Sequence, residues 1–350
     1  MEHFASTNVN RLSRRDFLKV AGAMGLSAAG MSLLEACGVK PATPIPEDTP
    51  LETTTIRLYK FPSLCLAPQY LAEDLLKDQG FTDVQYIETT TFDKDMASGK
   101  LDIGLLYAVL AISDLDAQAP LTMLSGVHVG CWELFGGEHI NTVKDLKGKT
   151  TPVAVLGGPQ HMFLATIAAY GGLDPNTDIN WVVMPVPEQA QALADGKVDA
   201  VLAYPANSQA QDLRAKKIGH VIFNSMMDDP WSQYFCCMVT ANREFAQKNP
   251  VATKRALRAL LEASDICARE PARAAQFMID KGYSKNYDYA LEAMQNIPYN
   301  RWREYDPEDT VIFYANQLRD VGLIKSNAND IVAKGTDWHF LNEIKQELKG

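Results

Sequence analysis

Two tyrosines end the same short pattern at two places in the chain. Residues 98–108 read SGKLDIGLLYA, and residues 195–205 read DGKVDAVLAYP. In each copy a glycine and a lysine precede an apolar run that closes on Tyr107 or Tyr204. A tyrosine offers an aromatic face for stacking and a hydroxyl for hydrogen bonding, so the pair predicts ligand binding. The alternative is that the pattern marks a common helix-to-strand turn and that both tyrosines only pack.

A glycine pair opens a second candidate site. Gly157 and Gly158 precede a predicted helix that contains His161. Glycines there let backbone N–H groups, which carry partial positive charge at a helix N-terminus, approach a ligand oxygen. The alternative is a plain strand-to-helix turn. His161 is interpreted as a surface residue or a ligand contact, because no metal-binding partner stands at helical spacing from it.

The remaining candidate binding residues are mostly aromatic and lie in predicted loops. Phe61 and Leu64 follow the first predicted strand, Asn207 follows Tyr204, and Trp231 and Tyr234 belong to the run PWSQYF. Basic residues are nearly absent from these loops, where only Lys60 adjoins them. A small anion would depend on charge and donors, so this composition favours a planar heterocycle.

The cysteines do not predict a metal site or a cofactor. The six are Cys37, Cys65, Cys131, Cys236, Cys237 and Cys267, and no two have CxxC spacing. Neighbouring residues of a strand face opposite sides, which predicts that Cys236 and Cys237 cannot hold one metal ion. With Cys37 set aside, five remain, so at least one thiol is free, and the pairing of the others stays open.

The elements that would position these residues alternate between strand and helix. Strands are predicted at 54–60 and in the runs VQYIET, LDIGLLYA, KTTPVAVLG, INWVVMP and VDAVLAYP, with helices between them; from Asn249 onward the chain reads as helical. This order predicts an α/β fold with mostly parallel sheets. Ligands bind beyond the carboxyl ends of such strands, so each copy of the repeat would bring its tyrosine to one cleft.

Charge and composition exclude some classes of function. The chain has 350 residues, 47% of them hydrophobic, with 43 acidic residues against 33 Lys and Arg. This is enough for a sizeable core. An acidic chain with no basic run after residue 50 is a poor nucleic-acid binder.

The first residues predict an export signal. Residues 13–19, SRRDFLK, match a twin-arginine signal; an apolar segment too short for a comfortable membrane span follows, and LEACG resembles a lipobox. We therefore expect a signal peptide at 1–36, lipidation of Cys37, and a proline-rich flexible tether at 37–53. The mature protein would be anchored on the extracytoplasmic face of the cell membrane.

The whole mature chain resembles the periplasmic solute-binding proteins of ABC importers. The motifs include APQYLAEDLLKDQGF, ASGKLDIGLL, ALADGKVDAVLAYPA and EFAQKNPVATKRALRALLEA. Within these proteins it is similar to the group for nitrate, sulfonates and taurine, thiamine-precursor pyrimidines and riboflavin. The resemblance implies a type II-like two-lobed fold, with lobe 1 at 54–145 plus 238–350, lobe 2 at 146–237, and a cleft between them.

The resemblance also implies a monomer that delivers a small molecule to a permease and an ATPase. We expect riboflavin or a thiamine-precursor pyrimidine as the solute, with a nitrate-, sulfonate- or taurine-type anion as the alternative. A ligand-sensing role would use the same closed lobes.

An enzyme is the weaker alternative. Fungal relatives that make the thiamine pyrimidine use a histidine, a lysine that holds pyridoxal phosphate and a cysteine stretch. In this chain Leu66 and Leu75 occupy the histidine and lysine positions, and Trp231–Phe235 contains no cysteine. We therefore expect no catalytic residues.

Overall fold

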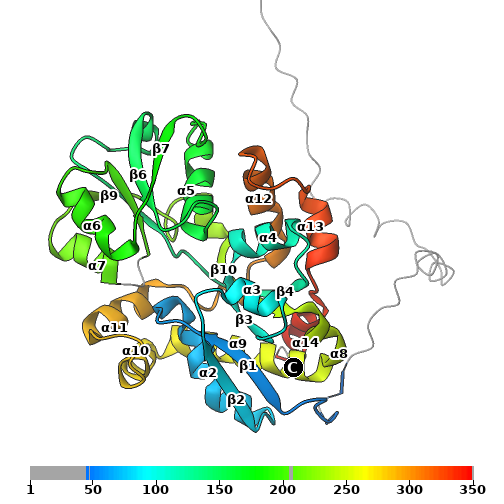
Figure 1. Cartoon of the computed structure of the whole chain (residues 1–350). Helices are drawn as coiled ribbons and strands as arrows, with labels where there is room; N and C mark the ends of the chain where they lie inside the picture. The colour runs from blue at the N-terminus through cyan, green and yellow to red at the C-terminus, as the bar shows by residue number, and fades with distance from the viewer. Residues whose placement is uncertain (1–44, 47, 205–207, 349–350) are drawn as a thin grey trace, which may run out of the picture. The chain divides into compact units, whose positions relative to one another are not determined.

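The computed structural model describes residues 45–46, 48–204 and 208–348. The predicted signal peptide, Cys37 and Asn207 lie outside this range. Residues from Ile45 onward form one compact unit, shown in Figure 1. Among the described residues, no helix is both long enough and apolar enough to span a membrane.

The first lobe contains five strands. Strands β1 (Thr55–Lys60) and β2 (Asp83–Glu88) pair in parallel. Strands β3 (Ile103–Tyr107) and β4 (Leu121–Val129) flank β10 (Phe235–Asn242), which runs antiparallel to both. Helices α2 (Ala67–Asp78), α3 (Phe92–Ala97) and α4 (Ala108–Asp116) follow β1, β2 and β3 in turn.

The second lobe repeats this plan and is drawn in green in Figure 1. Strands β6 (Lys149–Val153) and β7 (Ile179–Val183) pair in parallel, and β8 (Ala200–Ala203) and β9 (His220–Asn224) flank the antiparallel β5 (Glu133–Gly136). Helices α5 (Pro159–Tyr170), α6 (Val186–Ala194) and α7 (Ser208–Ala215) complete the lobe.

The chain passes between the lobes twice. Because β5 pairs with β8 and β9, the first crossing lies between Val129 and Glu133, ahead of the boundary predicted after residue 145. The return crossing lies between Asn224 and Phe235 and includes the short 3-10 helix η4 (Trp231–Gln233). The second lobe is thus inserted into the first.

The aspartate of the repeated stretch, Asp102 or Asp199, makes equivalent hydrogen bonds in each lobe. The backbone N–H of Asp102 donates to the Arg57 carbonyl, and its carboxylate accepts from the Arg57 N–H at 2.8 Å. Asp199 makes the equivalent pair of bonds with Thr150, both at 2.8 Å. Each aspartate therefore connects the first parallel strand of its lobe, β1 or β6, to the start of β3 or β8. This shared structural role explains why the Gly-Lys-apolar-Asp pattern occurs in both lobes.

A buried glutamine reinforces each of these junctions. The Gln69 side chain donates to the Tyr59 carbonyl at 2.7 Å and accepts from the Leu105 N–H at 3.1 Å. Gln160 accepts from the Ala154 N–H at 2.9 Å and donates to the Leu202 carbonyl at 2.6 Å. Both belong to a Pro-Gln dipeptide that opens the helix after the first strand of the lobe.

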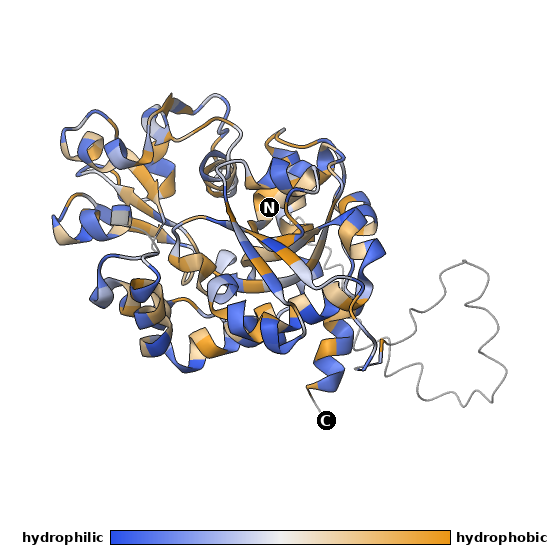
Figure 2. Cartoon of the chain, turned by 60° about the horizontal axis from the view of Figure 1, so that its bottom comes forward, coloured by the Kyte–Doolittle hydropathy of each residue, from blue (hydrophilic) through white to orange (hydrophobic). Residues whose placement is uncertain are grey.

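The helices that follow β10 pack mainly around the first lobe. In Figure 2 they carry alternating apolar and polar stripes, as expected of helices with one buried face. They are α8 (Arg243–Lys248), α9 (Pro250–Arg269), α10 (Pro271–Asp280), α11 (Tyr287–Asn296), α12 (Pro307–Asp320), α13 (Ala328–Gly335) and α14 (His339–Glu347).

The described part of the predicted tether is docked rather than free. The Glu52 carboxylate accepts from the backbone N–H groups of Val251 and Ala252, both at 3.0 Å, at the N-terminus of α9. Arg255 donates to the Thr49 carbonyl at 2.9 Å, and Lys254 donates to the Ile45 carbonyl at 3.1 Å. The folded unit therefore begins at or before Ile45, not at residue 54, because these residues cap and cover α9.

Candidate functional site

A cavity of about 580 Å³ lies between the two lobes. Its walls come from the loops and helix starts that follow the carboxyl ends of β1, β2, β3, β6 and β8, together with part of β10. The lining includes Tyr59, Phe61, Pro62, Ser63, Cys65, Phe92, Asp93, Lys94, Tyr107, Leu110, Asp114, residues 154–160, Met162, Val186, Tyr204 and Cys237. A volume in this range suits an organic ligand.

The two tyrosines of the repeat meet in this cavity. Their ring centroids are 5.8 Å apart with a tilt of 43°, and both rings contact the fully buried Trp132, at 5.5 Å for Tyr107 and 4.1 Å for Tyr204. Burial raises the pKa of both phenols, so both remain protonated at neutral pH. The prediction that Tyr107 and Tyr204 come from different lobes to one cleft therefore agrees with this geometry.

The tyrosines do not leave space for a ring between them. Two aromatic faces that enclose a flat ligand must stand about 7 Å apart, twice the contact distance of roughly 3.5 Å between stacked carbon atoms. At 5.8 Å and 43° the rings of Tyr107 and Tyr204 pack against each other instead. In this conformation the two rings together form one surface of the cavity. A flat ligand can therefore pack against this surface but cannot insert between the two rings.

The N-terminus of α5 forms part of the opposite wall. Gly158 is the N-cap residue and supplies no side-chain cap, and Gly157 has a φ of +76°, which favours glycine. Among the described residues, the backbone N–H groups of Gln160 and His161 have no protein acceptor. The first turn of this helix can therefore donate to a ligand oxygen.

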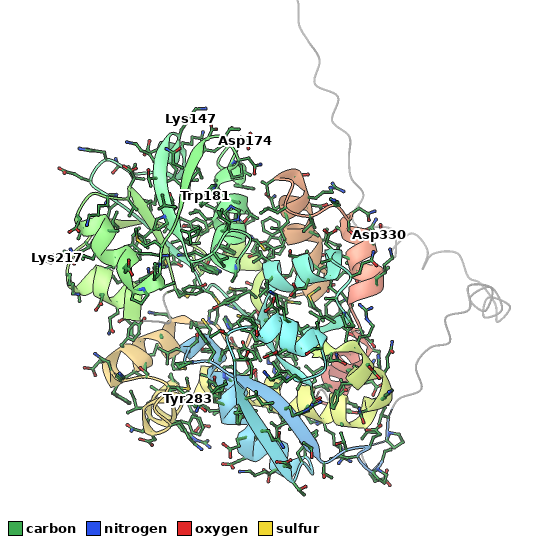
Figure 3. The ribbon with its side chains drawn as sticks, viewed as in Figure 1. Lys147, Asp174, Trp181, Lys217, Tyr283 and Asp330 are labelled. Atoms are coloured by element: carbon green, nitrogen blue, oxygen red, sulfur yellow. The ribbon has the colours of Figure 1, made fainter. Side chains whose placement is uncertain are left out.

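His161 supports this turn from outside the cavity. Its Nδ1 accepts from the Gly157 N–H at 3.2 Å, and its ring packs edge-on against Trp181 at 4.7 Å; Figure 3 labels Trp181 in the second lobe. Burial lowers the pKa of His161, which keeps the imidazole neutral and able to accept.

The first lobe contributes the charged groups of the cavity. Asp114, on α4, has a buried Oδ2 with no hydrogen-bond partner among the described residues. Burial, and then the neighbouring Asp93, raise the pKa of Asp114 to about 7, while Lys94 opposes the shift. At neutral pH this carboxyl is therefore near half-ionised.

Three further predicted binding residues, Leu64, Trp231 and Tyr234, lie outside the cavity walls. Leu64 is buried in the first lobe with 2% exposure. Trp231 is buried against Tyr170 and Phe223, and Tyr234 stacks on Phe313 at 4.0 Å. Five of the predicted residues do line it, namely Phe61, Tyr107, Gly157, Gly158 and Tyr204.

Several lining residues were not predicted. Phe92, Asp93 and Lys94 open the helix after β2, whose carboxyl end belongs to the same edge as that of β1. Applying the strand-end rule to every parallel strand would have found them. Asp114 lies in the middle of a helix, and no local sequence signal distinguishes it.

The prediction that Cys236 and Cys237 face opposite sides was wrong. Phe235 pairs with Val129 and Cys237 with His128, so Cys236 is an extra residue at a bulge in β10. A bulge turns neighbouring side chains away from strict alternation. Ligand atoms of Cys131, Cys236 and Cys237 accordingly lie within 4.8 Å of one another.

The two lobes, the two crossings and the cavity between them define the periplasmic-binding-protein fold. A solved structure titled as the periplasmic nitrate-binding protein NrtA of Synechocystis matches 86% of this chain and 90% of its own, with a TM-score of 0.72 and 15% identity. A sulfonate-binding protein from Methylobacillus flagellatus matches 85% and 96%, with a TM-score of 0.64 and 18% identity.

Sequence comparison assigns the family. The profile of the NMT1/THI5-like family matches residues 67–274, so the chain belongs to that family. The nitrate/nitrite binding protein NrtA of Synechococcus elongatus is 25% identical, over 81% of this chain and 73% of its own length. A yeast relative named 4-amino-5-hydroxymethyl-2-methylpyrimidine phosphate synthase THI13 is 23% identical, over 71% of this chain and 83% of its own.

Proposed function

We propose that this protein is the extracytoplasmic solute-binding component of an ABC importer of the nitrate and sulfonate type, and that its ligand is an organic anion. The observation that carries the proposal is the uncapped first turn of α5 in the wall of a cavity between two lobes. Backbone donors at a helix N-terminus favour the oxygens of an anion. The similarity to the nitrate/nitrite binding protein NrtA favours an anion as the ligand.

The size and the lining of the cavity favour an organic anion over nitrate itself. A volume of about 580 Å³ far exceeds what four heavy atoms fill. Tyr107, Tyr204 and Leu110 present apolar surface to the interior, which an alkyl or aryl group would cover. A sulfonate or carboxylate head at α5 with such a body matches both features.

The mouth of the cavity supports binding by closure. Phe61 of the first lobe is 42% exposed, and Val155 and Leu156 of the second lobe are each 55% exposed. Exposed apolar side chains that line a groove are common where a ligand or a partner surface covers them. Closure of the lobes on a solute would bury these three side chains.

A planar heterocycle is the second candidate, because the charges of the cavity favour it. Lys94 is the basic side chain among the lining residues, and Asp93 and Asp114 would repel an anion when ionised. A neutral ring with N–H donors would satisfy Asp114 and lie against the tyrosines. The aromatic lining alone does not decide between the two classes.

Calorimetry on the purified chain separates them. The panel contains methanesulfonate, longer alkanesulfonates, taurine and nitrate, with riboflavin and an aminopyrimidine as heterocycles. We expect micromolar or tighter binding of an alkanesulfonate and weaker binding of nitrate. Tight binding of a heterocycle with no heat from any anion would contradict the proposed ligand class.

An enzyme of the kind named for the yeast relative is not proposed. At the positions to which the fungal resemblance points, this chain has Leu66, Leu75 and a cysteine-free Trp231–Phe235 stretch. Leu66 is buried, and Trp231 packs in a cluster outside the cavity. A transport role and a receptor-coupled sensing role use the same cleft, and a loss of solute uptake by cells in which the gene for this protein is deleted would support transport.

A further inference from the structure

Four thiols and one imidazole gather beneath the floor of the cavity. Cys65 follows β1, His128 lies at the end of β4 and Cys131 in the first crossing after it, and Cys236 and Cys237 lie near the start of β10, just after the return crossing. Each of these five residues is at most 4% exposed. The cluster therefore joins the first cavity loop to both chain crossings.

The separations between these groups suit a tetrahedral ion. Cys131 Sγ lies 3.5 Å from Cys65 Sγ and 3.7 Å from Cys237 Sγ. Two thiolates bound to zinc at about 2.3 Å in a tetrahedron stand about 3.8 Å apart. A disulfide requires about 2.05 Å, so these sulfurs would have to move closer by well over an ångström to pair.

The ligand atoms form two overlapping groups. The groups are Cys65 with His128 and Cys131, and Cys131 with Cys236 and Cys237; within each, all ligand atoms lie within 4.8 Å of one another. Cys131 is common to both, so any ion held here would depend on its sulfur. Soft thiolate and imidazole ligands select Zn²⁺ and Cu⁺ over hard cations.

His128 adds an independent observation. Its ring is fully buried, and its Nε2 has no hydrogen-bond partner within the described part of the chain. The nearest groups to Nδ1 are the Val129 carbonyl at 3.2 Å and Cys131 Sγ at 3.8 Å. Buried polar groups with unsatisfied atoms are rare, and an ion nearby is one of the recognised explanations.

We propose that this protein binds one thiophilic d¹⁰ cation, Zn²⁺ or Cu⁺, at a buried site centred on Cys131, with up to three further ligands from among Cys65, His128, Cys236 and Cys237. Each thiol that coordinates loses its proton to solvent, and the ion forms a bond to each resulting thiolate. The five side chains are buried, as the ligands of structural metal sites are, and Cys65 and Cys237 also line the solute cavity. The ion holds the two crossings and the first cavity loop together, so it stabilises the floor on which the solute rests.

Metal content of the full chain tests the proposal first. Protein expressed in the cytoplasm and purified without chelator should carry about one equivalent of zinc or copper by elemental mass spectrometry, which also tells the two ions apart. Reconstitution with Co²⁺ should give thiolate-to-metal charge-transfer absorption. Removal of the ion should lower the midpoint of thermal unfolding by about 5 °C or more.

Matched serine variants locate the ligands. Cys131→Ser should reduce the metal content at least tenfold, whereas Cys267→Ser should retain it, because Cys267 is equally buried but belongs to neither group. Comparing Cys65→Ser with Cys237→Ser decides which group supplies more of the ligands. If Cys131→Ser does not fold, the metal content and Co²⁺ spectrum of the unaltered chain remain decisive.

Two results would overturn the inference. One is a chain that contains less than about a tenth of an equivalent of metal and gives no charge-transfer band with Co²⁺. The other is intact-mass and alkylation data that show a Cys65–Cys131 or Cys131–Cys237 disulfide in protein recovered from its native compartment. Neither result would bear on the solute proposal, whose test is calorimetry on the same protein.

Discussion

A single carboxyl group on α4 couples the cavity to pH. The pKa of Asp114 is about 7 in the folded protein against an ordinary value of 3.8, with burial as the main cause. Between these two values the folded chain holds a proton that the unfolded chain releases, so stability falls as the pH rises from about 4 to about 7. The loss is complete about one pH unit above the folded pKa, near pH 8.

Replacing Asp114 with asparagine should remove this loss. The free energy of unfolding of Asp114→Asn should match that of the unaltered protein near pH 4 and exceed it by on the order of 2 kcal/mol at pH 8, after allowance for solvent screening. Urea unfolding at pH 4, 6 and 8 measures this. A difference that does not change with pH would show that Asp114 titrates normally.

The same variant separates the two candidate ligand classes. Ionised Asp114 repels an anion, so the Kd of an alkanesulfonate should rise roughly tenfold between pH 6 and pH 8, and Asp114→Asn should abolish the change. Calorimetry at both pH values provides the measurement. Tighter binding at the higher pH would instead indicate a ligand that donates to the carboxylate.

At the scale of residues, the sequence predicted which side chains lie at strand ends better than it predicted which side chains pack against one another. Tyr107 and Tyr204 could be brought to one cleft because each ends a strand of the same repeat. Trp231 and Tyr234 could not be excluded in the same way, because whether an aromatic loop residue packs on Phe313 or faces a ligand depends on helices far along the chain. Asp114 is distinguished by its burial and by the neighbouring Asp93, and its local sequence within α4 gives no signal of either.

The matched glutamines show how the two lobes are built from one element plan. Gln160→Leu would remove the four hydrogen bonds of this side chain, two of them with Gln189, and leave the Ala154 N–H and the Leu202 carbonyl without these partners. We expect a loss of about 2–4 kcal/mol in unfolding free energy, since unsatisfied buried groups cost about 1–3 kcal/mol each. Chemical denaturation measures the loss.

The exposed Gln276→Leu is the control for this variant. It should change the unfolding free energy by less than about 0.5 kcal/mol. Equal effects of the two substitutions would mean that Gln160 is not a structural junction.

The cap of α9 gives a second prediction at this scale. Glu52 accepts from two backbone N–H groups that the helix itself leaves unpaired. Glu52→Ala should therefore lower the thermal midpoint, with a cost of about 1–2 kcal/mol, whereas Glu138→Ala on the surface should have little effect. Differential scanning calorimetry of both variants makes the comparison, and an unchanged midpoint for Glu52→Ala would argue against the docked segment.

Strands and helices were predicted where hydrophobic periodicity was clear. The parallel strands β1, β2, β6 and β7 and their helices fall close to the predicted ranges. The crossing strand β5 is only four residues long, so the first boundary was placed too late. The bulge in β10 is defined by its pairing with β4, and no residue in the run CCMV at 236–239 predicts it from sequence.

At the scale of the whole molecule, the export signal yields its own prediction. The lipobox resemblance places a lipid on Cys37, which lies outside the described residues. Cys37→Ala should release the protein from the membrane fraction and leave the Kd for its solute unchanged, because the cavity belongs to a separate folded unit. Fractionation followed by calorimetry tests both parts, and a variant that stays with the membrane after a salt wash would refute the anchor.

The segment from Ile45 to Glu52, which is bonded to α9, limits the length of chain between a lipid on Cys37 and the folded unit. With the chain held at Ile45 by Lys254, only seven residues separate the body from Cys37, and the eight steps between these two positions span at most about 29 Å. A lipid there would confine every copy to a layer a few nanometres deep above the membrane. Confinement of that kind raises the local concentration of the protein at a permease in the same bilayer above that of a protein free in the compartment. A weak docking surface on the protein would then be sufficient for delivery.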